Sequence, residues 1–379
     1  MKLKVLAIVG TRPDALKMAP VILELQKHPE CISLSVAATG QHREMLDQVL
    51  RVFGIQPDRD LAVMQDRQTL SGLTQRILIG LGELISDEKP DIVLAQGDTT
   101  TTFVAGLVAF YHKVAFGHVE AGLRTDDKYD PYPEEMNRRL TSVLTDLHFA
   151  PTALARRNLL SCGVRDENIY VTGNTVIDAL LMVEKQPYEF EDSVIRAALD
   201  RAKKMVLVTA HRRENWGEPM TRICGAIREI PRLFPGTEVI FSVHRNPIVR
   251  DVVFPELLDR PGVTLIEPPE YVPFVHLMKR SYLILTDSGG VQEEAPSLGK
   301  PVLVMRKNTE RPEGVEAGTA KLVGTDKEKI LDEVGGLLTD SAAYSAMART
   351  ANPYGDGHAA ERICATLIER LPTLARTPV

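Results

Sequence analysis

The sequence predicts an α/β protein built from two Rossmann-like, doubly wound domains that face a cleft. Short apolar runs alternate with helical patterns through the chain, and the loops rich in charged residues follow the ends of apolar runs. This alternation is typical of parallel sheets covered by helices, in which ligands bind at the carboxyl ends of the strands. We therefore expect an N-terminal domain at 1–172, a C-terminal domain at 173–352, and a last helix at about 353–371 that packs back on the N-terminal domain.

Composition and charge narrow the class of protein. The 379 residues are 44% hydrophobic, enough for the cores of two domains. The net charge of −6 argues against a general affinity for nucleic acid or an anionic membrane, so an anionic ligand needs local cations. No apolar run approaches the ~18 residues of a membrane helix, and the first run is too short for a signal peptide. Four widely spaced cysteines show no metal-binding pattern. We expect a cytoplasmic protein with no metal site and no nucleic-acid or membrane partner.

The first predicted strand, 5–9, leads through Gly10-Thr11-Arg12-Pro13 into a helix. The loop lacks the Gly-x-Gly-x-x-Gly fingerprint, which disfavours a nicotinamide-dependent dehydrogenase. It carries Arg12, and Lys17 follows about one turn into the helix, so two cations could reach one anion. A pair of solvated surface cations is the alternative interpretation.

Two acids lie at the ends of later strands. The strands of this half that follow the first are predicted at 34–38, 92–95, 114–120 and 147–150. Asp98 follows the second of these, where it could instead be the N-cap of the next helix. Glu120 closes the third, and strand alternation would place it on the same face as Phe116 and His118. A buried glutamate at that place needs a partner or a task.

Basic side chains follow strands in the second half as well. These strands are predicted at 205–210, 238–243, 264–266, 282–286 and 301–305. His211 and Arg212 follow the first, His244 follows the second, and Arg311 lies in the loop after the last. Such residues at a carboxyl edge indicate an anionic ligand, and a salt-bridged loop is the alternative.

Ser288-Gly289-Gly290 follows the strand at 282–286 and begins a helical stretch. Backbone N–H groups at such a turn are unpaired and favour a phosphate, which glycines allow to approach closely. The Ser288 hydroxyl could cap the helix or bind the ligand, and Glu294 could bind ribose hydroxyls. Taken alone, the Ser-Gly-Gly turn is more often an ordinary loop with a good N-cap, so the phosphate interpretation depends on the rest of the site.

Several motifs together carry a family resemblance. In this order and spacing the chain resembles the non-hydrolysing bacterial UDP-N-acetylglucosamine 2-epimerases from Lys4 to about Glu369. The motifs are Gly10-Thr11-Arg12-Pro13, Gln96-Gly97-Asp98-Thr99, His118-Val119-Glu120-Ala121-Gly122-Leu123-Arg124, Pro133-Glu134-Glu135-x-Asn137-Arg138, His211-Arg212-Arg213-Glu214-Asn215 and Thr286-Asp287-Ser288-Gly289-Gly290-x-Gln292-Glu293-Glu294.

The resemblance implies a glycosyltransferase-B-like fold, a homodimer, no cofactor, and reversible conversion of UDP-GlcNAc to UDP-ManNAc in the cytoplasm for surface polysaccharides. The substrate contacts it implies are Arg12, Lys17, Asp98, Glu120, His211, Phe274, Ser288, Gly289, Gly290, Glu294 and Arg311, with Phe274 near the uracil. An adjacent activating site for a second UDP-GlcNAc would by position involve Gln41, Glu44, Arg67, Glu134, Arg212 and His244.

The implied reaction needs proton carriers on both faces of the sugar, because the hydrogen on C2 is not next to a carbonyl. Elimination of UDP to a 2-acetamidoglucal, followed by its re-addition, avoids a poorly stabilised carbanion. We interpret Asp98 and Glu120 as the principal proton carriers, Glu134 as an assisting or coupling acid, and His211 as a group that stabilises the departing diphosphate. Glu134 follows Pro133 at a predicted helix start, where the helix dipole alone could explain an acid.

Three other functions remain open at this point. A hydrolysing 2-epimerase would add water to the glucal and release ManNAc and UDP. A glycosyltransferase on the same scaffold is disfavoured, because Pro301 and Val302 stand where its Glu-x7-Glu pair would place the second acid. A non-catalytic nucleotide-sugar sensor is disfavoured by three carboxylates near a diphosphate pocket, since they would weaken the binding of an anion.

Overall fold

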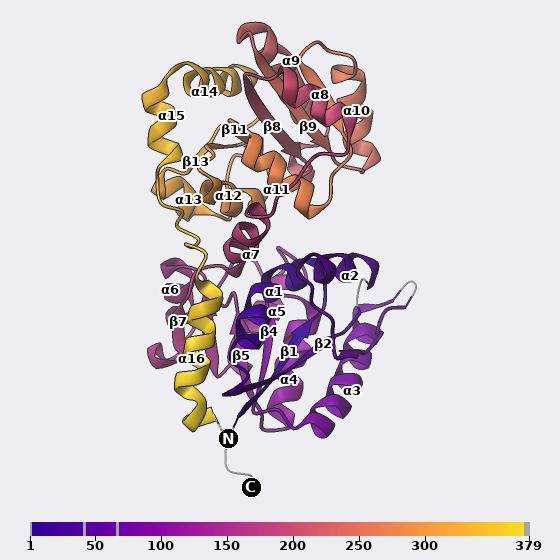
Figure 1. The fold of residues 1–379 in the computed structure, drawn as a ribbon, viewed down its shortest axis with the longest axis vertical. Helices are drawn as coiled ribbons and strands as arrows, with labels where there is room; N and C mark the ends of the chain where they lie inside the picture. Colours follow the sequence, from indigo (N-terminus) through magenta and orange to yellow (C-terminus); the bar gives the residue numbers. More distant parts are fainter. Residues whose placement is uncertain (1, 41–42, 66–67, 375–379) are drawn as a thin grey trace. The chain divides into compact units, whose positions relative to one another are not determined.

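The computed structural model describes residues 2–40, 43–65 and 68–374, and Figure 1 shows its ribbon. Contacts between Cα atoms divide the chain into two compact units. The N-terminal unit comprises Met1–Ala179 and Gly355–Val379, and the C-terminal unit comprises Leu180–Tyr354. The chain therefore leaves the N-terminal unit once and returns to it for its last helix.

The N-terminal unit is built on a parallel sheet of seven strands in the order β3-β2-β1-β4-β5-β6-β7. Its central strands are continuous apolar runs because helices cover both faces of the sheet. The strands are β1 (Leu3–Val9), β2 (Ile32–Ala38), β3 (Arg59–Asp60), β4 (Ile92–Gln96), β5 (Ala115–Val119), β6 (Leu147–Ala150) and β7 (Ile169–Val171). The helices are α1 (Arg12–Gln26), α2 (Arg43–Val52), α3 (Leu70–Glu88), α4 (Thr100–Tyr111), α5 (Glu134–Leu144), α6 (Ala153–Ser161), the short η1 (Asp166–Asn168), α7 (Thr175–Glu184), which continues into the C-terminal unit, and α16 (Ala359–Leu374).

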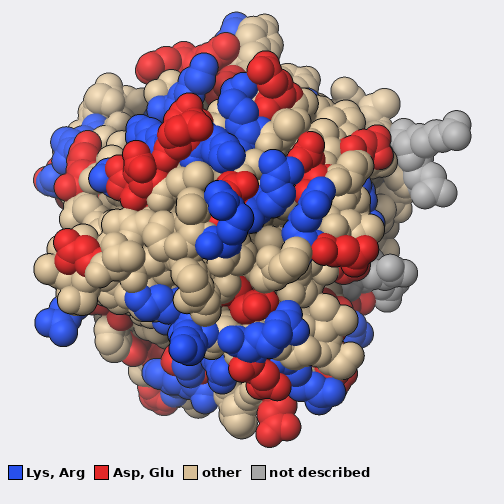
Figure 2. All heavy atoms as spheres, turned by 90° about the horizontal axis from the view of Figure 1, so that it is seen from above, with Lys and Arg blue, Asp and Glu red and all other residues tan. Residues whose placement is uncertain are grey.

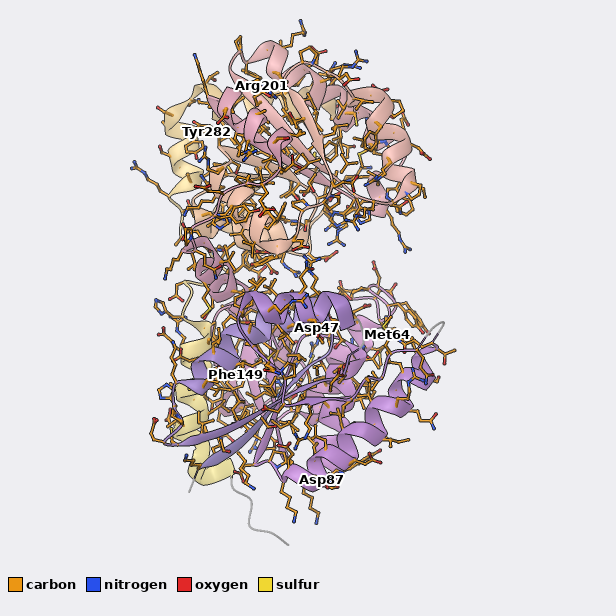
Figure 3. The ribbon with its side chains drawn as sticks, turned by 45° about the vertical axis from the view of Figure 1, so that its right-hand side comes forward. Asp47, Met64, Asp87, Phe149, Arg201 and Tyr282 are labelled. Carbon is orange, nitrogen blue, oxygen red and sulfur yellow. The ribbon has the colours of Figure 1, made fainter. Side chains whose placement is uncertain are left out.

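Side-chain alternation along β1 builds two cores in this unit. Val5, Ala7 and Val9 belong to a core that includes residues of α1, α2 and α16. Leu6 and Ile8 belong to the other, with residues of α3 and α4. Phe149, labelled in Figure 3, is fully buried in the first core. The last helix, α16, is yellow in Figure 1 and packs on α1, contributing residues such as Ile363 to this core.

The C-terminal unit has a parallel sheet of six strands in the order β10-β9-β8-β11-β12-β13. The strands are β8 (Lys204–Ala210), β9 (Thr237–Val243), β10 (Val263–Ile266), β11 (Leu283–Thr286), β12 (Val302–Val304) and β13 (Ala320–Leu322). The helices are α8 (Ser193–Arg201), η2 (Arg213–Asn215), α9 (Glu218–Leu233), α10 (Pro247–Leu257), α11 (Tyr271–Arg280), α12 (Gly289–Glu294), η3 (Ala295–Leu298), α13 (Pro312–Ala317), α14 (Lys327–Thr339) and α15 (Ser341–Ala348).

Both strand orders are those of doubly wound Rossmann sheets, so the predicted fold class of two such domains is confirmed. Three strands escaped prediction. β3 is two residues long and charged, and β7 and β13 have three residues each, one of them exposed. All three are edge strands, which present few buried positions and therefore little apolar periodicity.

Surface and helix properties bear on possible partners. Among the described residues, no helix is long and apolar enough to cross a membrane. On the face displayed in Figure 2, Lys and Arg side chains lie among Asp and Glu side chains rather than in one continuous basic area. An anionic ligand therefore has to be bound by particular cations at a local site.

Candidate active site

The strand order of the N-terminal sheet reverses between β1 and β4, and ligands of doubly wound sheets bind at this switch point. The loop from Gly10 to Arg12 follows β1, and the loop from Gly97 to Thr99 follows β4. The loop after β1 packs closely against the start of α4, because a Cβ atom added to Gly10 would lie only 2.6 Å from the Thr101 hydroxyl oxygen. Glycine is therefore required at position 10 for this contact.

A buried acid ties these two loops together. Asp14 accepts hydrogen bonds from the backbone N–H of Thr11 at 3.0 Å and from the hydroxyl of Thr99 at 3.2 Å. Burial raises the pKa of Asp14 to about 7, the bonds from Thr11 and Thr99 oppose the rise, and the negative charge of Asp98 adds to it. This role could not be predicted, because an acid in the first turn of a helix is common for dipole reasons alone.

Asp98 is held by a cation and not by a helix cap. The Asp98 carboxylate accepts hydrogen bonds from Arg138 Nε at 2.9 Å and Nη2 at 2.7 Å. The Asn137 side-chain amide donates to the Asp98 carbonyl at 2.9 Å. The alternative reading of Asp98 as an N-cap is wrong, because Thr99 caps α4 by accepting from the backbone N–H of Thr102. The carboxylate of Asp98 is 28% exposed, so it is oriented and still reachable.

Glu120 is the most heavily bonded acid of the N-terminal switch point. Its carboxylate accepts hydrogen bonds from the side chains of Lys17 at 2.5 Å and Asn174 at 2.8 Å, and from the amide of Gln96. Only 8% of the residue is exposed. Three donors on one carboxylate compensate for its burial and fix its position.

The alternation argument for Glu120 is wrong. β5 ends at Val119, and Glu120 has a left-handed φ of 65°. The turn out of the strand therefore sets the direction of the side chain, and the strand period does not. A left-handed non-glycine residue is strained, and such strain is concentrated at functional sites.

His118 supports the Gly97 loop from beneath. Its Nε2 lies 2.7 Å from the Gly97 carbonyl oxygen. Burial lowers the pKa of His118 to about 4, although the bond to Gly97 opposes the shift. The imidazole is therefore neutral at neutral pH, and its Nε2–H donates to the carbonyl.

Two predicted residues of this unit keep their charged groups available. Glu134 lies in the first turn of α5, as predicted, and Arg12 lies in the first turn of α1. Both are half-buried, and neither makes an ion pair or side-chain hydrogen bond with any described residue. A free cation and a free acid remain for a ligand.

The C-terminal sheet reverses its order between β8 and β11, and Asp287 organises the loops at that point. Its fully buried carboxylate accepts hydrogen bonds at 2.9 Å from the backbone N–H groups of His211 and Arg212 and from the Asn215 side-chain amide. His211 Nδ1 lies 3.3 Å from the same carboxylate. Asp287 thus fixes both the backbone and the ring of His211.

The His211 imidazole faces the loop after β9. It stacks on the His244 ring with centroids 5.6 Å apart. Burial lowers the pKa of His211, while Asp287 opposes the shift. His211 therefore presents its second ring nitrogen as a donor or acceptor that a ligand can use.

The Ser288-Gly289-Gly290 turn leaves its groups open. The Ser288 hydroxyl does not cap α12, which removes one of its two predicted roles. The atom nearest to a Cβ atom added at Gly289 would be Arg212 Nη2, at 3.6 Å. Outside this turn and its helix, no described backbone atom lies within 4 Å of that added Cβ atom, and the atom that borders the space over Gly289 belongs to a guanidinium.

A pocket of about 200 Å³ adjoins this turn within the C-terminal unit. A flat ring that enters it would meet apolar and aromatic side chains, with hydroxyls and imidazoles at its edge. Its lining consists of Thr209, Ala210, His211, Ser242, His244, Pro268, Pro269, Phe274, Ser288 and Val291.

Three predicted ligand contacts have protein partners in this structure. The Glu294 carboxylate accepts a hydrogen bond from the Tyr271 hydroxyl at 3.0 Å. Arg311 forms an ion pair with Glu293, as Lys17 does with Glu120. Both cations thus lie at the expected strand ends, where buried acids hold them in place.

The residues of the implied activating site are only partly described. Gln41 and Arg67 lie outside the described residues, and so does the side chain of Glu44. Arg212 lies 3.9 Å from Glu310, and its buried Nε has no hydrogen-bond partner among the described residues. His244 Nδ1 accepts from the backbone N–H of Asn246 at 3.1 Å.

Comparison with known proteins decides the family. A family model described as UDP-N-acetylglucosamine 2-epimerase matches residues 23–368. The chain belongs to the UDP-N-acetylglucosamine 2-epimerase family. This confirms the resemblance inferred from the motifs, and the relatives that carry the name are isomerases.

Several family members match over nearly their full length. The UDP-N-acetylglucosamine 2-epimerase of Bacillus subtilis strain 168 is 54% identical, with 97% of this chain and 95% of that protein covered. That of Escherichia coli strain K12 is 53% identical, with 96% and 98% covered. The crystal structure of UDP-GlcNAc 2-epimerase from Neisseria meningitidis bound to UDP-GlcNAc is 50% identical, with 97% of this chain and 100% of that chain covered and a TM-score of 0.84.

Sequence reasoning missed the residues that orient the acids and the imidazole of this epimerase-family site. They are Asp14, Gln96, Arg138, Asn174 and Asp287. Gln96, Arg138 and Asp287 lay inside quoted motifs, where proximity to a functional residue was the one available signal. Asn174 reaches Glu120 from 54 positions away, and only the folded chain shows that contact.

Proposed function

We propose that this chain converts UDP-GlcNAc reversibly to UDP-ManNAc through anti elimination of UDP to a 2-acetamidoglucal, followed by re-addition of UDP. One observation carries the proposal. Two carboxylates, Asp98 and Glu120, lie at the switch point of the N-terminal sheet, each fixed by side-chain donors from distant parts of the chain. Proton transfer requires such positioned acids, and ligand binding alone would not.

The movement of protons and electron pairs in the reaction explains why it needs acidic side chains. A base takes the C2 proton, the C–H electron pair becomes the C1–C2 double bond, and the C1–O bond breaks with its electrons leaving on UDP. In the return step UDP bonds to C1 while an acid protonates C2 from the other face. One carboxylate must therefore begin ionised and another group must carry a proton.

We assign the two proton carriers as Asp98 and Glu120, with Glu134 assisting or coupling substrate and activator sites. Arg138 orients Asp98 through two bonds, which suits a group that must point at one hydrogen. Lys17 forms an ion pair with Glu120, which holds that carboxylate in one position.

UDP is assigned to the C-terminal unit, with the uracil against Phe274 in the pocket beside His244 and the ribose at Glu294. The diphosphate is assigned to the Ser288-Gly289-Gly290 turn, where the added negative charge on departure would be stabilised by His211. Arg311, which an ion pair with Glu293 holds in the same unit, is assigned as a cation for the diphosphate. Arg12 and Lys17 are assigned as the substrate-binding cations of the N-terminal unit.

Product analysis tests the proposal. UDP-GlcNAc incubated with the protein and followed by phosphorus and proton NMR should give UDP-ManNAc with the diphosphate ester intact, and UDP-ManNAc should return UDP-GlcNAc. Free ManNAc with stoichiometric UDP would instead identify a hydrolysing 2-epimerase. Tight binding without turnover would identify a nucleotide-sugar sensor, and transfer to an added acceptor would identify a glycosyltransferase.

We further propose a cytoplasmic homodimer that a second UDP-GlcNAc activates and that takes no nucleic-acid or membrane partner. Free thiols at all four cysteines suit a reducing compartment.

Support for a dimer comes from large exposed apolar side chains on neighbouring helices of the N-terminal unit. They are Phe110 and Tyr111 of α4 and Leu140 and Val143 of α5. Light scattering of the wild type and of Val143→Glu should show a dimer that the charge disrupts, and sigmoidal UDP-GlcNAc kinetics should report activation.

A further inference from the structure

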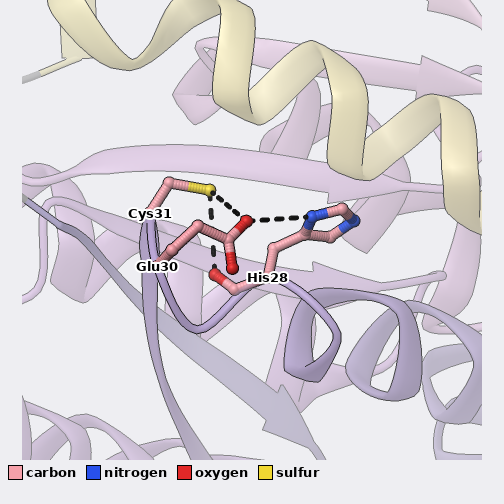
Figure 4. A group of neighbouring side chains, drawn as sticks. All are labelled: His28, Glu30 and Cys31. Atoms are coloured by element: carbon pink, nitrogen blue, oxygen red, sulfur yellow. Dashed lines mark hydrogen bonds and ion pairs between the residues drawn. The ribbon is translucent and has the colours of Figure 1, made fainter.

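The turn between α1 and β2 gathers three different kinds of metal-binding side chain (Figure 4). His28, Glu30 and Cys31 each offer one ligand atom, and these atoms lie within 4.8 Å of one another. Within 2–40, 43–65 and 68–374, no other three His, Cys, Asp or Glu residues meet this spacing. We propose that this turn is a zinc site, with His28 Nδ1, the Glu30 carboxylate and the Cys31 thiolate as ligands and water in the fourth position.

The observed separations are those of a tetrahedral zinc ion. Zinc–ligand bonds of about 2.0 Å to nitrogen and oxygen and 2.3 Å to sulfur place tetrahedral ligand atoms about 3.3 to 3.6 Å apart. Glu30 Oε1 lies 3.4 Å from His28 Nδ1 and 3.6 Å from Cys31 Sγ. Two edges of the tetrahedron are therefore already formed. A small side-chain rotation closes the third edge, between sulfur and nitrogen.

Glu24 contacts the His28 imidazole from the side opposite Glu30. Its Oε1 faces His28 Nε2 at 3.5 Å, and its other oxygen accepts from Lys27 Nζ at 2.6 Å. With a metal ion on Nδ1, the carboxylate at Nε2 would accept the remaining ring proton, which is the usual arrangement around a zinc-binding histidine. In the metal-free chain Glu30 accepts from Cys31 Sγ and faces His28 Nδ1, so zinc would take the place of the proton on the thiol.

The backbone of the turn is already ordered. The His28 carbonyl accepts hydrogen bonds from the N–H groups of Cys31 at 3.2 Å and Ile32 at 2.9 Å. The Cys31 carbonyl accepts from Leu3 at the start of β1 at 2.8 Å. Zinc would therefore bind a preformed turn and pay little conformational entropy. Sequence analysis did not find the site because His-x-Glu-Cys is not a recurring zinc spacing.

The site is independent of the proposed function. It lies where β2 begins, whereas the candidate active-site loops follow the carboxyl ends of β1 and β4. Zinc here would link the end of α1 to the start of β2 and stabilise the N-terminal unit, because a ligand that binds the native state raises its stability. Epimerase activity would not require it.

Zinc titration of the full chain tests the site. Calorimetry with Zn²⁺ in a phosphine-reduced sample should show one equivalent bound to the wild type and to Cys162→Ser, which removes the other thiol that is accessible. Cys31→Ser and Glu30→Gln should each weaken binding by at least about tenfold. Glu30→Gln removes a ligand but keeps the thiol, so weaker binding by this variant cannot result from an effect of the cysteine change on the fold. Circular dichroism checks that both variants are folded.

Cobalt gives a second readout. Co²⁺ bound to wild type or Cys162→Ser should show a thiolate-to-metal charge-transfer band that is absent from Cys31→Ser. The proposal is overturned if wild type and Cys31→Ser bind Zn²⁺ equally, or if binding and the band disappear with Cys162. It is also overturned if the wild type binds no Zn²⁺.

Discussion

Arg138 binds the carboxylate of Asp98 through two nitrogen atoms, Nε at 2.9 Å and Nη2 at 2.7 Å. Both nitrogens bind the same carboxylate oxygen, Oδ2, and together they fix its position. We predict that Arg138→Gln lowers kcat for epimerisation by about 100-fold or more, because misplacing a catalytic group by about 1 Å has that effect. Arg138→Lys should be intermediate, since one ammonium does not reproduce the fork.

Arg156→Gln is the matched control for Arg138. It removes another doubly bonded arginine–aspartate pair of the N-terminal unit, with Asp166, but one that is exposed. Exposed pairs contribute about 0–1 kcal/mol to stability, so the control should retain its kcat and fold. Equal kcat values for Arg138→Gln and the control, measured at saturating UDP-GlcNAc, would contradict the positioning role.

Gly289→Ala should weaken nucleotide binding without lowering the stability of the protein. The atom nearest to the added methyl group would be Arg212 Nη2 at 3.6 Å, an ordinary contact, so the thermal unfolding midpoint should not fall. UDP affinity should drop by about tenfold or more, because the methyl group occupies the path of the diphosphate to the backbone. Gly336→Ala in α14, whose added methyl meets nothing within 4 Å, is the control. If calorimetry gave equal UDP affinities for the two variants, the assignment of the diphosphate to this turn would be wrong.

Phe274→Ala should weaken UDP binding through loss of stacking on the uracil. Base–aromatic stacking contributes about 1–3 kcal/mol, which corresponds to roughly 5- to 150-fold in the dissociation constant. Phe274→Tyr keeps the ring and should bind UDP nearly as the wild type does. The effect should appear mainly in KM, since Phe274 lines the pocket and does not touch the reacting carbons. A large loss of kcat with unchanged KM would place the uracil elsewhere.

Asp14 makes stability depend on pH. Its pKa rises from 3.8 to about 7 in the folded chain, chiefly by burial, so the folded state binds the proton more tightly than the unfolded state. The stability that this proton contributes is full below pH 3.8 and is lost as the pH rises to about 7, on the order of 4 kcal/mol in total. Asp14→Asn has no such proton, so its free energy of unfolding should decrease less over this pH range than that of the wild type.

Urea unfolding of wild type and Asp14→Asn at pH 4 to 7 measures the difference in slope. Asp178, whose pKa burial raises to about 6, contributes to both proteins and cancels in the comparison. Parallel stability curves would show that the Asp14 carboxyl titrates normally in the folded chain.

The fold was predictable because both sheets are parallel and buried on both faces. β1 and β8 are continuous apolar runs followed by polar loops, which is the local signature of a strand in a doubly wound sheet. The edge strands β3 and β13 were not predictable, because they are too short and too exposed to show a period.

The residues of the candidate site could be predicted only where they lie in a recognisable sequence motif. Asp98 and Glu120 were found because they end apolar strands, and Ser288 because glycines follow it. The geometry of these residues could not be predicted, because the φ of 65° at Glu120 and the contact from Asn174 arise from tertiary structure. The partners of Lys17 and Arg311 were missed for the same reason.

Deuterium incorporation tests the central claim most directly, because the account requires that the C2 hydrogen leave the sugar on every catalytic cycle. The protein is incubated with UDP-GlcNAc in deuterated water, and both nucleotide sugars are examined by proton NMR during turnover. The account predicts deuterium at C2 of UDP-ManNAc and, by reversal, its gradual appearance at C2 of UDP-GlcNAc. UDP-ManNAc that retains the original hydrogen at C2 would contradict it.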